Sequence, residues 1–269
     1  MSEKRVAIIG GGNIGLSIAN GLVHSKLYKR NEIILTRRNI APLSEYEQNG
    51  YIVLSDNKKA VSESEIIVIA VQPQQMNELL EEIKDVLVEG KHIIMSVVSG
   101  ATILAIQNVI AKKVSVVRAM PNTAIAIQES MTCLSSDDKD ALESAEKIFN
   151  TLGTSLIIKE ELMGPATALC ACGIAFFLRA IRAASQGGIE IGFHAEEAIL
   201  MAAQTAKGAA SLLLENKNHP ENEVDKVTTP RGITISGLNQ MEHHGFSSAM
   251  IKGIVTSAEK AAKIYADKT

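Results

Sequence analysis

RVAIIGGGNIG, residues 5–15, joins a short apolar segment of strand type to a Gly-x-Gly-x-x-Gly turn. A helical pattern over 16–23 and a second apolar segment over 32–36 complete a strand–helix–strand unit. The glycines permit a tight turn, close approach of the backbone to a pyrophosphate, and a helix start whose N–H groups face the phosphates. The motif alone is weak evidence, but this context predicts a bound dinucleotide rather than an ordinary turn. The expected contacts are Gly10, Gly12, Asn13, Ile14 and Gly15.

The end of the second predicted strand indicates which nucleotide is bound. A site for NAD places a carboxylate about 20 residues after the glycine turn, where it binds the ribose 2′-hydroxyl. This chain has Thr36-Arg37-Arg38 at that position and no acid. Guanidinium groups match the oxygens of a 2′-phosphate, although arginines are also ordinary at a solvated strand end. We therefore expect NADPH as the cofactor, with NADH less favoured.

Composition excludes several classes of protein. The balance of 27 basic and 30 acidic residues gives no polycation for nucleic acid and no basic face for a membrane. Cys133, Cys170 and Cys172 support neither a disulfide framework nor a zinc site. The last two lie among alanines, which favours small packing residues and leaves a reactive thiol open. The first strand begins at Arg5 without room for a signal peptide, so we expect a cytoplasmic protein.

Strands and helices alternate through the first part of the chain. Further strands are predicted at 65–71, 91–97, 114–118, 131–134 and 154–158, with helices over 75–87, up to 110, and over 137–152. Asp137 and Asp138 suit the start of the last of these helices. Such repeats predict an α/β fold, a Rossmann-type, doubly wound parallel sheet with helices on both faces.

The second part is predicted to be helical throughout. Helices are expected over 162–185, 195–215, 233–243 and 247–266, with breaks at Gly187-Gly188, at 216–221 and at Thr229-Pro230. We therefore expect residues 1–160 to form an NADP-binding Rossmann domain and residues 161–269 a helical domain for dimerisation and substrate binding.

The uncharged segment 162–178 superficially resembles a membrane span. It is shorter than the roughly 20 residues that a bilayer requires, and Gly164-Pro165 interrupts its start. A helix buried on most sides, inside a domain or between subunits, fits better. The next helix is rich in alanine and the chain has few aromatic residues, which favours a homodimer or larger homo-oligomer, although a self-contained bundle would look similar.

Two further segments follow predicted parallel strands and are expected to reach the cofactor. Ligands of open α/β sheets bind beyond the carboxyl ends of the strands. A proline in each segment fixes the backbone, although each segment alone is weak evidence. The residues expected to contact the cofactor are Ala70, Val71, Gln72, Pro73, Met120, Pro121 and Asn122.

The richest candidate in the helical part is Val227-Thr228-Thr229-Pro230-Arg231-Gly232-Ile233-Thr234. Hydroxyl groups and a glycine stand there at the start of a predicted helix. Free N–H groups and the helix dipole favour a small anion such as a carboxylate. A plain helix cap with threonines would give a similar pattern.

Taken together, these segments resemble the pyrroline-5-carboxylate reductase family, whose members reduce a cyclic imine to proline with NAD(P)H. The family's Ala-Val-Lys-Pro segment is similar to Ala70–Pro73, and its Met-Pro-Asn-Thr motif to Met120–Thr123. Its signature Val-Thr-Ser-Pro-Gly-Gly-Thr-Thr is similar to Val227–Thr234. An asparagine that the family places near the adenosine ribose matches Asn57. The resemblance covers essentially the whole chain in order.

The resemblance implies hydride transfer from C4 of the nicotinamide to the C=N carbon of 1-pyrroline-5-carboxylate. It implies that backbone N–H groups of the signature loop bind the substrate carboxylate and that the last threonine, Thr234, lies near the imine nitrogen. The implied substrate-binding residues are Thr229, Arg231, Gly232, Ile233 and Thr234, and no metal is expected. Positioning can lower the barrier without a strong acid or base.

The chain departs from the family pattern at several positions. Arg231 replaces the first glycine of the signature's pair, and Ile233 replaces a threonine. A Ser-Gly-Ser-Gly-Pro-Ala-Tyr segment appears as CACGIAF, residues 170–176, and positions that are often acidic are Arg182 and Gln186. Arg231 can assist the substrate carboxylate or point into solvent.

Two alternative functions share this fold. A β-hydroxyacid dehydrogenase would need a lysine on the first long helix, and residues 164–186 contain none. A non-catalytic NADP-binding sensor or scaffold would have little reason to keep Gly232 and Thr234. Adjacent His243 and His244 diverge on a helix, so a solvated helix end is expected there rather than a metal site.

Overall fold

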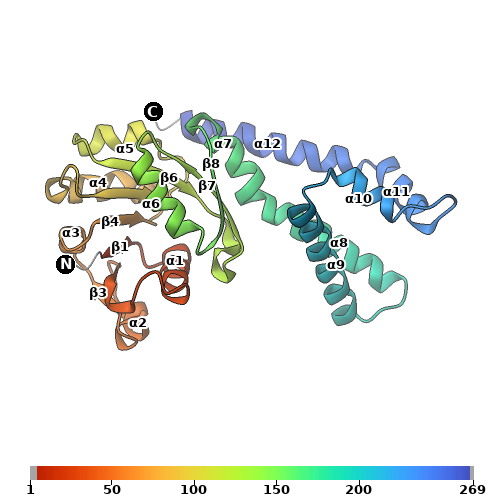
Figure 1. Ribbon diagram of the computed structural model, residues 1–269, viewed down its shortest axis with the longest axis horizontal. Coiled ribbons are helices and arrows are strands. Elements are labelled where there is room, and N and C mark those ends of the chain that lie inside the picture. Colours follow the sequence, from red (N-terminus) through yellow and green to blue (C-terminus); the bar gives the residue numbers. More distant parts are fainter. Residues whose placement is uncertain (1–4, 267–269) are drawn as a thin grey trace. The chain divides into compact units, whose positions relative to one another are not determined.

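The strand that precedes the glycine turn, β1 (Val6–Ile9), lies inside an eight-stranded sheet. In this computed structural model, residues 5–266 are described, with side chains described up to residue 262. Parallel neighbours β2 (Ile33–Thr36) and β4 (Ile66–Ile69) flank β1 in the order β3-β2-β1-β4-β5-β6-β7-β8 (Figure 1). Every residue of β1 and β2 is buried, so the prediction of apolar central strands is confirmed.

The remaining strands extend the sheet in both directions. They are β3 (Ile52–Leu54), β5 (Ile93–Ser96), β6 (Ser115–Met120), β7 (Ser130–Ser135) and β8 (Gly153–Ile157). All pairs are parallel except β6 and β7, which are antiparallel. The predicted parallel sheet is therefore right for most strands and wrong at this one pair. The 3₁₀ turn Thr123–Ile127 makes only a short connection there, without the crossover helix that a parallel pair requires.

Helices cover both faces of the sheet, as predicted. On one face Ile8, Val68 and Val117 pack with α1 (Asn13–His24) and α6 (Lys139–Phe149). On the other face Ile9, Ile67 and Val116 pack with α4 (Met76–Ile83) and α5 (Ile103–Ile110). Successive side chains of a strand point to opposite faces, which is why adjacent residues belong to two separate cores.

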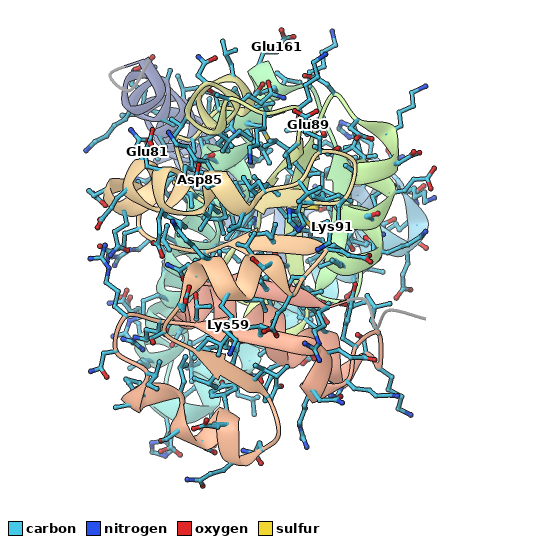
Figure 2. The ribbon with its side chains drawn as sticks, turned by 90° about the vertical axis from the view of Figure 1, so that its left-hand side faces the viewer. Lys59, Glu81, Asp85, Glu89, Lys91 and Glu161 are labelled. Atoms are coloured by element: carbon cyan, nitrogen blue, oxygen red, sulfur yellow. The ribbon has the colours of Figure 1, made fainter. Side chains whose placement is uncertain are left out.

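The outer surfaces of these helices are charged. Lys59, Glu81 and Asp85 extend from the helical segments on one side of the sheet toward solvent (Figure 2). Asp138 caps α6 by accepting hydrogen bonds from the N–H groups of Asp140 and Ala141, which confirms the predicted helix start.

Some short elements were not predicted. They are β3, α2 (Ser44–Gln48), α3 (Asn57–Ser62) and α10 (Pro220–Lys226). Each spans two helical turns or fewer, or three strand residues, so little periodicity is available to find it.

The helical part contains α7 (Met163–Ala166), a π-helical turn at Thr167–Cys172, and α8 (Gly173–Glu190). They are followed by α9 (Ala195–Asn216), α11 (Ile233–His243) and α12 (Phe246–Ala266). The predicted break at Gly187-Gly188 is wrong, because α8 continues through it. A side chain at Gly188 would lie 3.0 Å from the Ala198 Cβ, so the glycine permits α8 and α9 to pack closely. Gly192, with φ +114°, follows the helix end instead.

The chain divides into two compact units. One extends to Cys172 and includes the chain from Ser257 onward, and the other is Gly173–Thr256. The predicted division at residue 160 remains a prediction.

We expect Gly153→Ala to destabilise the sheet more than Gly50→Ala does. Gly153 has φ +140°, and an added Cβ would lie 2.1 Å from the Ser130 carbonyl oxygen on β7. Gly50 has φ +93° with no atom within 4 Å of an added Cβ, so it isolates the cost of the left-handed backbone. The expected losses in free energy of unfolding are roughly 2–4 and about 1 kcal/mol, measured by urea denaturation at equal protein concentration. Equal losses would contradict the close β7–β8 contact.

Candidate cofactor site and helical loop

Two glycines of the turn, Gly10 and Gly15, leave no space for a side chain. Gly10 has φ +111°, and a Cβ there would lie 2.5 Å from the carbonyl oxygen of Ala70, at the end of β4. A Cβ at Gly15 would lie 2.2 Å from the Gly10 carbonyl oxygen. The N–H groups of Gly10 and Gly11 both donate to the Thr36 carbonyl oxygen, at 3.2 and 2.9 Å. The turn is thereby tied to the ends of both strands that flank β1.

Gly12 is the position that faces open space. No atom lies within 4 Å of the Cβ that would be added to it. It is the N-cap of α1, makes no side-chain capping bond, and no acidic residue occupies the first helical turn. The first N–H groups of a helix lack intrahelical partners. This helix start therefore presents donors to a negatively charged group, which fits a pyrophosphate.

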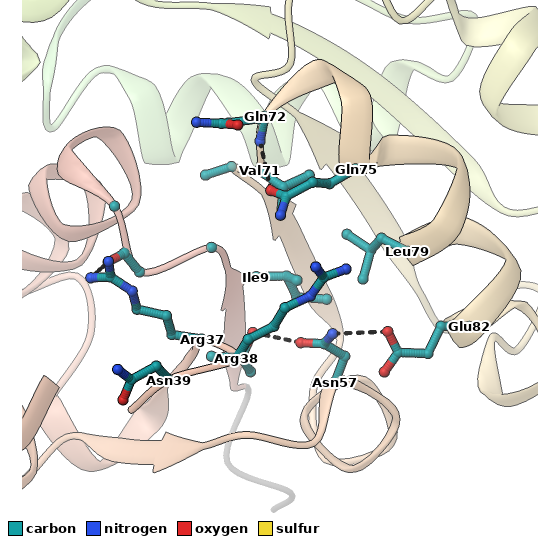
Figure 3. A pocket seen from close by; sticks show the side chains of 15 residues that line it. Ile9, Arg37, Arg38, Asn39, Asn57, Val71, Gln72, Gln75, Leu79 and Glu82 are labelled. Atoms are coloured by element: carbon teal, nitrogen blue, oxygen red, sulfur yellow. Dashed lines mark hydrogen bonds between the residues drawn. The ribbon is translucent and has the colours of Figure 1, made fainter. Parts of the chain in front are cut away.

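A cavity of about 420 Å³ lies beside this turn (Figure 3). It brings together most of the predicted cofactor residues outside α1, namely Gly10, Gly12, Thr36, Arg37, Arg38, Asn57, Ala70, Val71 and Gln72. Ile9, Gly11, Asn39, Gln75, Leu79 and Glu82 complete its lining. Asn13, Ile14 and Gly15 lie in the first turn of α1 but do not line the cavity, and Pro73 borders a separate one.

At the end of the cavity where the ribose 2′ group is predicted to bind, side chains form a series of hydrogen bonds. The buried hydroxyl of Thr36 donates to Asn57 Oδ1 at 2.7 Å. Asn57 Nδ2 in turn donates to Glu82 Oε2 at 3.1 Å (Figure 3). Arg37 donates to the Gly11 carbonyl oxygen at 3.2 Å. These contacts place the threonine, the asparagine and one guanidinium around the same end of the cavity.

Two acidic side chains at this end were missed by the sequence analysis. Glu78 pairs with Arg38 at 2.6 Å, and Glu82 accepts from Asn57. Both come from α4, which follows β4 rather than β2. Their spacing of four residues on one helical face was visible in the sequence. Nothing in the sequence indicated that this face meets the end of β2.

Asn122 is buried, does not line this cavity, and connects neighbouring segments through hydrogen bonds. Its backbone N–H donates to Ser130 Oγ at 3.1 Å, and its Oδ1 accepts from the Ala124 N–H at 3.0 Å. Its Nδ2 donates to the Cys170 carbonyl oxygen at 3.3 Å. Neither Asn122 nor its neighbours Met120 and Pro121 line the cavity, so their contact with a cofactor remains a prediction.

The loop at 229–234 is a tight turn at the start of α11. Arg231 has φ +62°, a backbone conformation that glycine adopts without strain, and its side chain is exposed. The Gly232 N–H donates to the Thr229 carbonyl oxygen at 2.8 Å. A Cβ at Gly232 would lie 2.5 Å from Thr229 Oγ1. Because Gly232 is the N-cap, the N–H groups of Ile233 and Thr234 lie at the helix start, where intrahelical acceptors are lacking.

The rings of His243 and His244 meet edge to face with centroids 5.4 Å apart, so the expectation that these side chains diverge is wrong. Among the residues that the structure describes, no group of three or more potential metal ligands occurs.

Comparison with known proteins agrees with the description of both the cofactor site and the helical part. A family model described as pyrroline-5-carboxylate reductase dimerisation matches residues 160–264. A second, described as NADP oxidoreductase, coenzyme F420-dependent, matches residues 5–100. Pyrroline-5-carboxylate reductase 2 of Dictyostelium discoideum is 51% identical, over 98% of this chain and 94% of the relative. The chain belongs to the pyrroline-5-carboxylate reductase family.

Two other relatives add detail. Pyrroline-5-carboxylate reductase 1 of the same organism is 58% identical over 99% of this chain, which spans only 51% of that relative's length. The solved structure of a pyrroline-5-carboxylate reductase from Coxiella burnetii is 28% identical and superposes with a TM-score of 0.91. It covers 97% of this chain and 98% of its own.

Family membership also bears on the apolar helix of the second part. The helical segment Glu160–Glu190 is long and apolar enough to cross a membrane by length and composition, and only 17% of its most apolar window is buried inside the chain. The chain itself therefore buries little of this segment. The dimerisation model covers all of it, and its burial between subunits remains a prediction.

We expect Arg37→Ala and Arg38→Ala to weaken the binding of NADPH by about 10- to 100-fold, the size of a lost hydrogen bond to a charged group. NADH lacks the 2′-phosphate, so its dissociation constant should change less than about threefold. Arg30→Ala is the matched control, because Arg30 stands before β2 and does not line the cavity. Equal loss for both nucleotides by titration calorimetry would contradict a 2′-phosphate site.

Glu78→Gln should have the opposite effect. Its carboxylate pairs with Arg38 and would repel a phosphate, so its neutralisation should tighten NADPH by about two- to fivefold. Glu81→Gln removes a carboxylate from the same helix that pairs with Lys84 instead, and should leave the affinity unchanged. Weaker binding of NADPH by Glu78→Gln would show that Arg38 needs its present partner.

Proposed function

We propose that this chain reduces 1-pyrroline-5-carboxylate to L-proline, with NADPH as the preferred reductant, as an oxidoreductase of the last step of proline biosynthesis. The observation that supports this best is the coexistence of two turns. One is a glycine turn that excludes side chains at Gly10 and Gly15, and the other is a strained loop that keeps Gly232 and Thr234 of the family signature.

The cofactor residues have distinct tasks in this proposal. When bound, NADPH supplies a hydride. The start of α1 holds the pyrophosphate through its free N–H groups, because Gly12 leaves the approach open. Thr36 and Asn57 fix the polar end of the cavity, and Arg37 and Arg38 bind a 2′-phosphate there. Ala70, Val71, Gln72 and Pro73, with Met120, Pro121 and Asn122, complete the proposed binding set.

The substrate residues lie at the start of α11. The helix dipole and the N–H groups of Ile233 and Thr234 attract the carboxylate. The Gly232 N–H already donates to Thr229, so Gly232 and Thr229 shape the turn as well as border the substrate. The hydroxyl of Thr234, exposed in the first turn of α11, holds the imine nitrogen in the orientation for reduction. Arg231 either assists the carboxylate or remains in solvent.

Orientation is the main contribution of these residues to the rate. A protonated imine carbon is already a good electrophile, so the chain needs to hold nitrogen and carboxylate in place rather than supply a strong base. The absence of lysine from residues 164–186 argues against the dehydrogenase alternative. The retained Gly232 and Thr234 argue against a non-catalytic sensor.

The proposal includes the assembly and setting of the protein. The dimerisation model at 160–264 supports a homo-oligomer, and we propose a homodimer or larger assembly formed through residues 161–269, with residues 1–160 binding NADP. All three cysteines are free, which supports a reducing compartment such as the cytoplasm. No metal, nucleic acid or membrane is required.

Turnover of 1-pyrroline-5-carboxylate with NADPH, followed by proline formation, tests the function. The wild-type protein should form proline, and Thr234→Val should lower kcat/KM by about 10- to 100-fold by removing a hydrogen bond to a charged nitrogen. Ser236→Ala is the control, because the Ser236 hydroxyl donates to the Gly232 carbonyl oxygen at the start of α11. No proline at any NADPH concentration would overturn the function, and unchanged activity of Thr234→Val would overturn the role of Thr234.

A further inference from the structure

Two cysteines from distant parts of the sequence meet in the first unit. Cys133 lies on β7 and Cys170 lies in the π-helical turn Thr167–Cys172, and their Sγ atoms are 3.9 Å apart. Met120 and Met163 pack in the same apolar cluster. Cys133 is 2% exposed, whereas Cys170 is partly exposed. Within one chain, Cys170 is therefore the thiol that a small oxidant reaches first, and Cys133 is the more buried partner.

The two thiols differ in their tendency to ionise. The hydrogen bond from Cys133 lowers the pKa of Cys170 to about 7, against the opposing effect of desolvation. The same contact and burial raise the pKa of Cys133. A thiolate is the reactive form of cysteine, so Cys170 is the nucleophile of the pair and Cys133 its proton-bearing partner.

We propose that Cys170 and Cys133 are a peroxide-sensitive thiol pair that closes to a reversible disulfide beside Asn122. Such pairs combine an accessible cysteine with a second cysteine that resolves the oxidised intermediate. Here Cys170 is the more accessible cysteine. Cys133, which is in contact with it in the same apolar cluster, is the second cysteine.

The chemistry balances with a hydroperoxide as the oxidant. The Cys170 thiolate attacks one peroxide oxygen, an S–O bond forms, and the O–O bond breaks to release hydroxide or alkoxide, which takes up a proton. The Cys133 sulfur then attacks the Cys170 sulfenic acid, so that an S–S bond forms and the S–O bond breaks. Water leaves with the Cys133 proton. The two thiols lose two electrons and two hydrogens in total, and the peroxide is reduced.

Disulfide formation requires the two sulfurs to move closer together. A disulfide needs the sulfurs about 2 Å apart, so they must close by roughly 2 Å. Cys170 lies in a π-helical turn, a wider and less common helical form that occurs often at functional sites. We expect rotation of the Cys170 side chain to bring the sulfurs together.

The disulfide would reach the proposed active site through Asn122. The Cys170 carbonyl oxygen accepts a hydrogen bond from Asn122 Nδ2, and Asn122 is 7% exposed. Asn122 belongs to the Met-Pro-Asn segment that follows β6. Fixing Cys170 to β7 therefore restrains this segment, and we expect turnover to fall on oxidation and to return on reduction.

Peptide mapping of the full chain after limited hydrogen peroxide tests the pair without relying on activity. A Cys133–Cys170 peptide lighter by two hydrogens should form, and dithiothreitol should reverse it. Cys170→Ser should abolish the crosslink. In Cys133→Ser, Cys170 should be oxidised further to sulfinic acid, because no resolving thiol remains. Cys133→Ala replaces this variant if serine destabilises the core. Cys172→Ser should crosslink like the wild type.

Turnover of 1-pyrroline-5-carboxylate before oxidation, after oxidation and after reduction provides the second readout, with each variant compared to its own reduced state. Reversible loss of turnover in the wild type and in Cys172→Ser, with no such loss in Cys170→Ser, supports the proposal. No crosslink, or a crosslink through Cys172, would overturn the pair. A Cys133–Cys170 crosslink that leaves turnover unchanged would overturn its connection to the site.

Discussion

The contact between the ends of β1 and β4 is the constraint on which the rest of the structure depends. A Cβ at Gly10 would overlap the Ala70 carbonyl oxygen, and a Cβ at Gly15 would overlap the Gly10 carbonyl oxygen. The same turn donates two hydrogen bonds to Thr36 at the end of β2. Central strand, turn and first helix are thus fixed together, and the helix start faces open space at Gly12.

This constraint explains where selectivity for the nucleotide can arise. Since the turn binds to the end of β2, whatever follows Thr36 lies at the edge of the same cavity. Arginines there attract a phosphate, but Glu78 and Glu82 of α4 already engage Arg38 and Asn57. The preference for NADPH therefore depends on how well the 2′-phosphate competes with these acidic side chains for Arg38 and Asn57.

The central strands and the glycine turn could be predicted because their signals are local: apolar runs, glycine spacing and the cap at Asp138. The antiparallel direction of β7 and the position of the acids of α4 could not, because they depend on which distant segments become neighbours. The short β3 offered too little periodicity to be found. The predicted break at Gly187-Gly188 is wrong for a related reason, since Gly188 permits close packing of α8 on α9 and forms no turn. The loop at Arg231 could be singled out from its hydroxyls, proline and glycine before a predicted helix, and its strained backbone appears only in the structure.

The central claim is that the glycine turn holds the electron donor and the Thr234 loop the acceptor of one reduction. Reduction of 1-pyrroline-5-carboxylate with NADPH deuterated at C4 of the nicotinamide, in both stereoisomers, tests it most directly. We predict that one stereoisomer transfers its deuterium to the proline carbon that belonged to the C=N bond, while the other transfers hydrogen. Proline without deuterium from either stereoisomer would contradict the account.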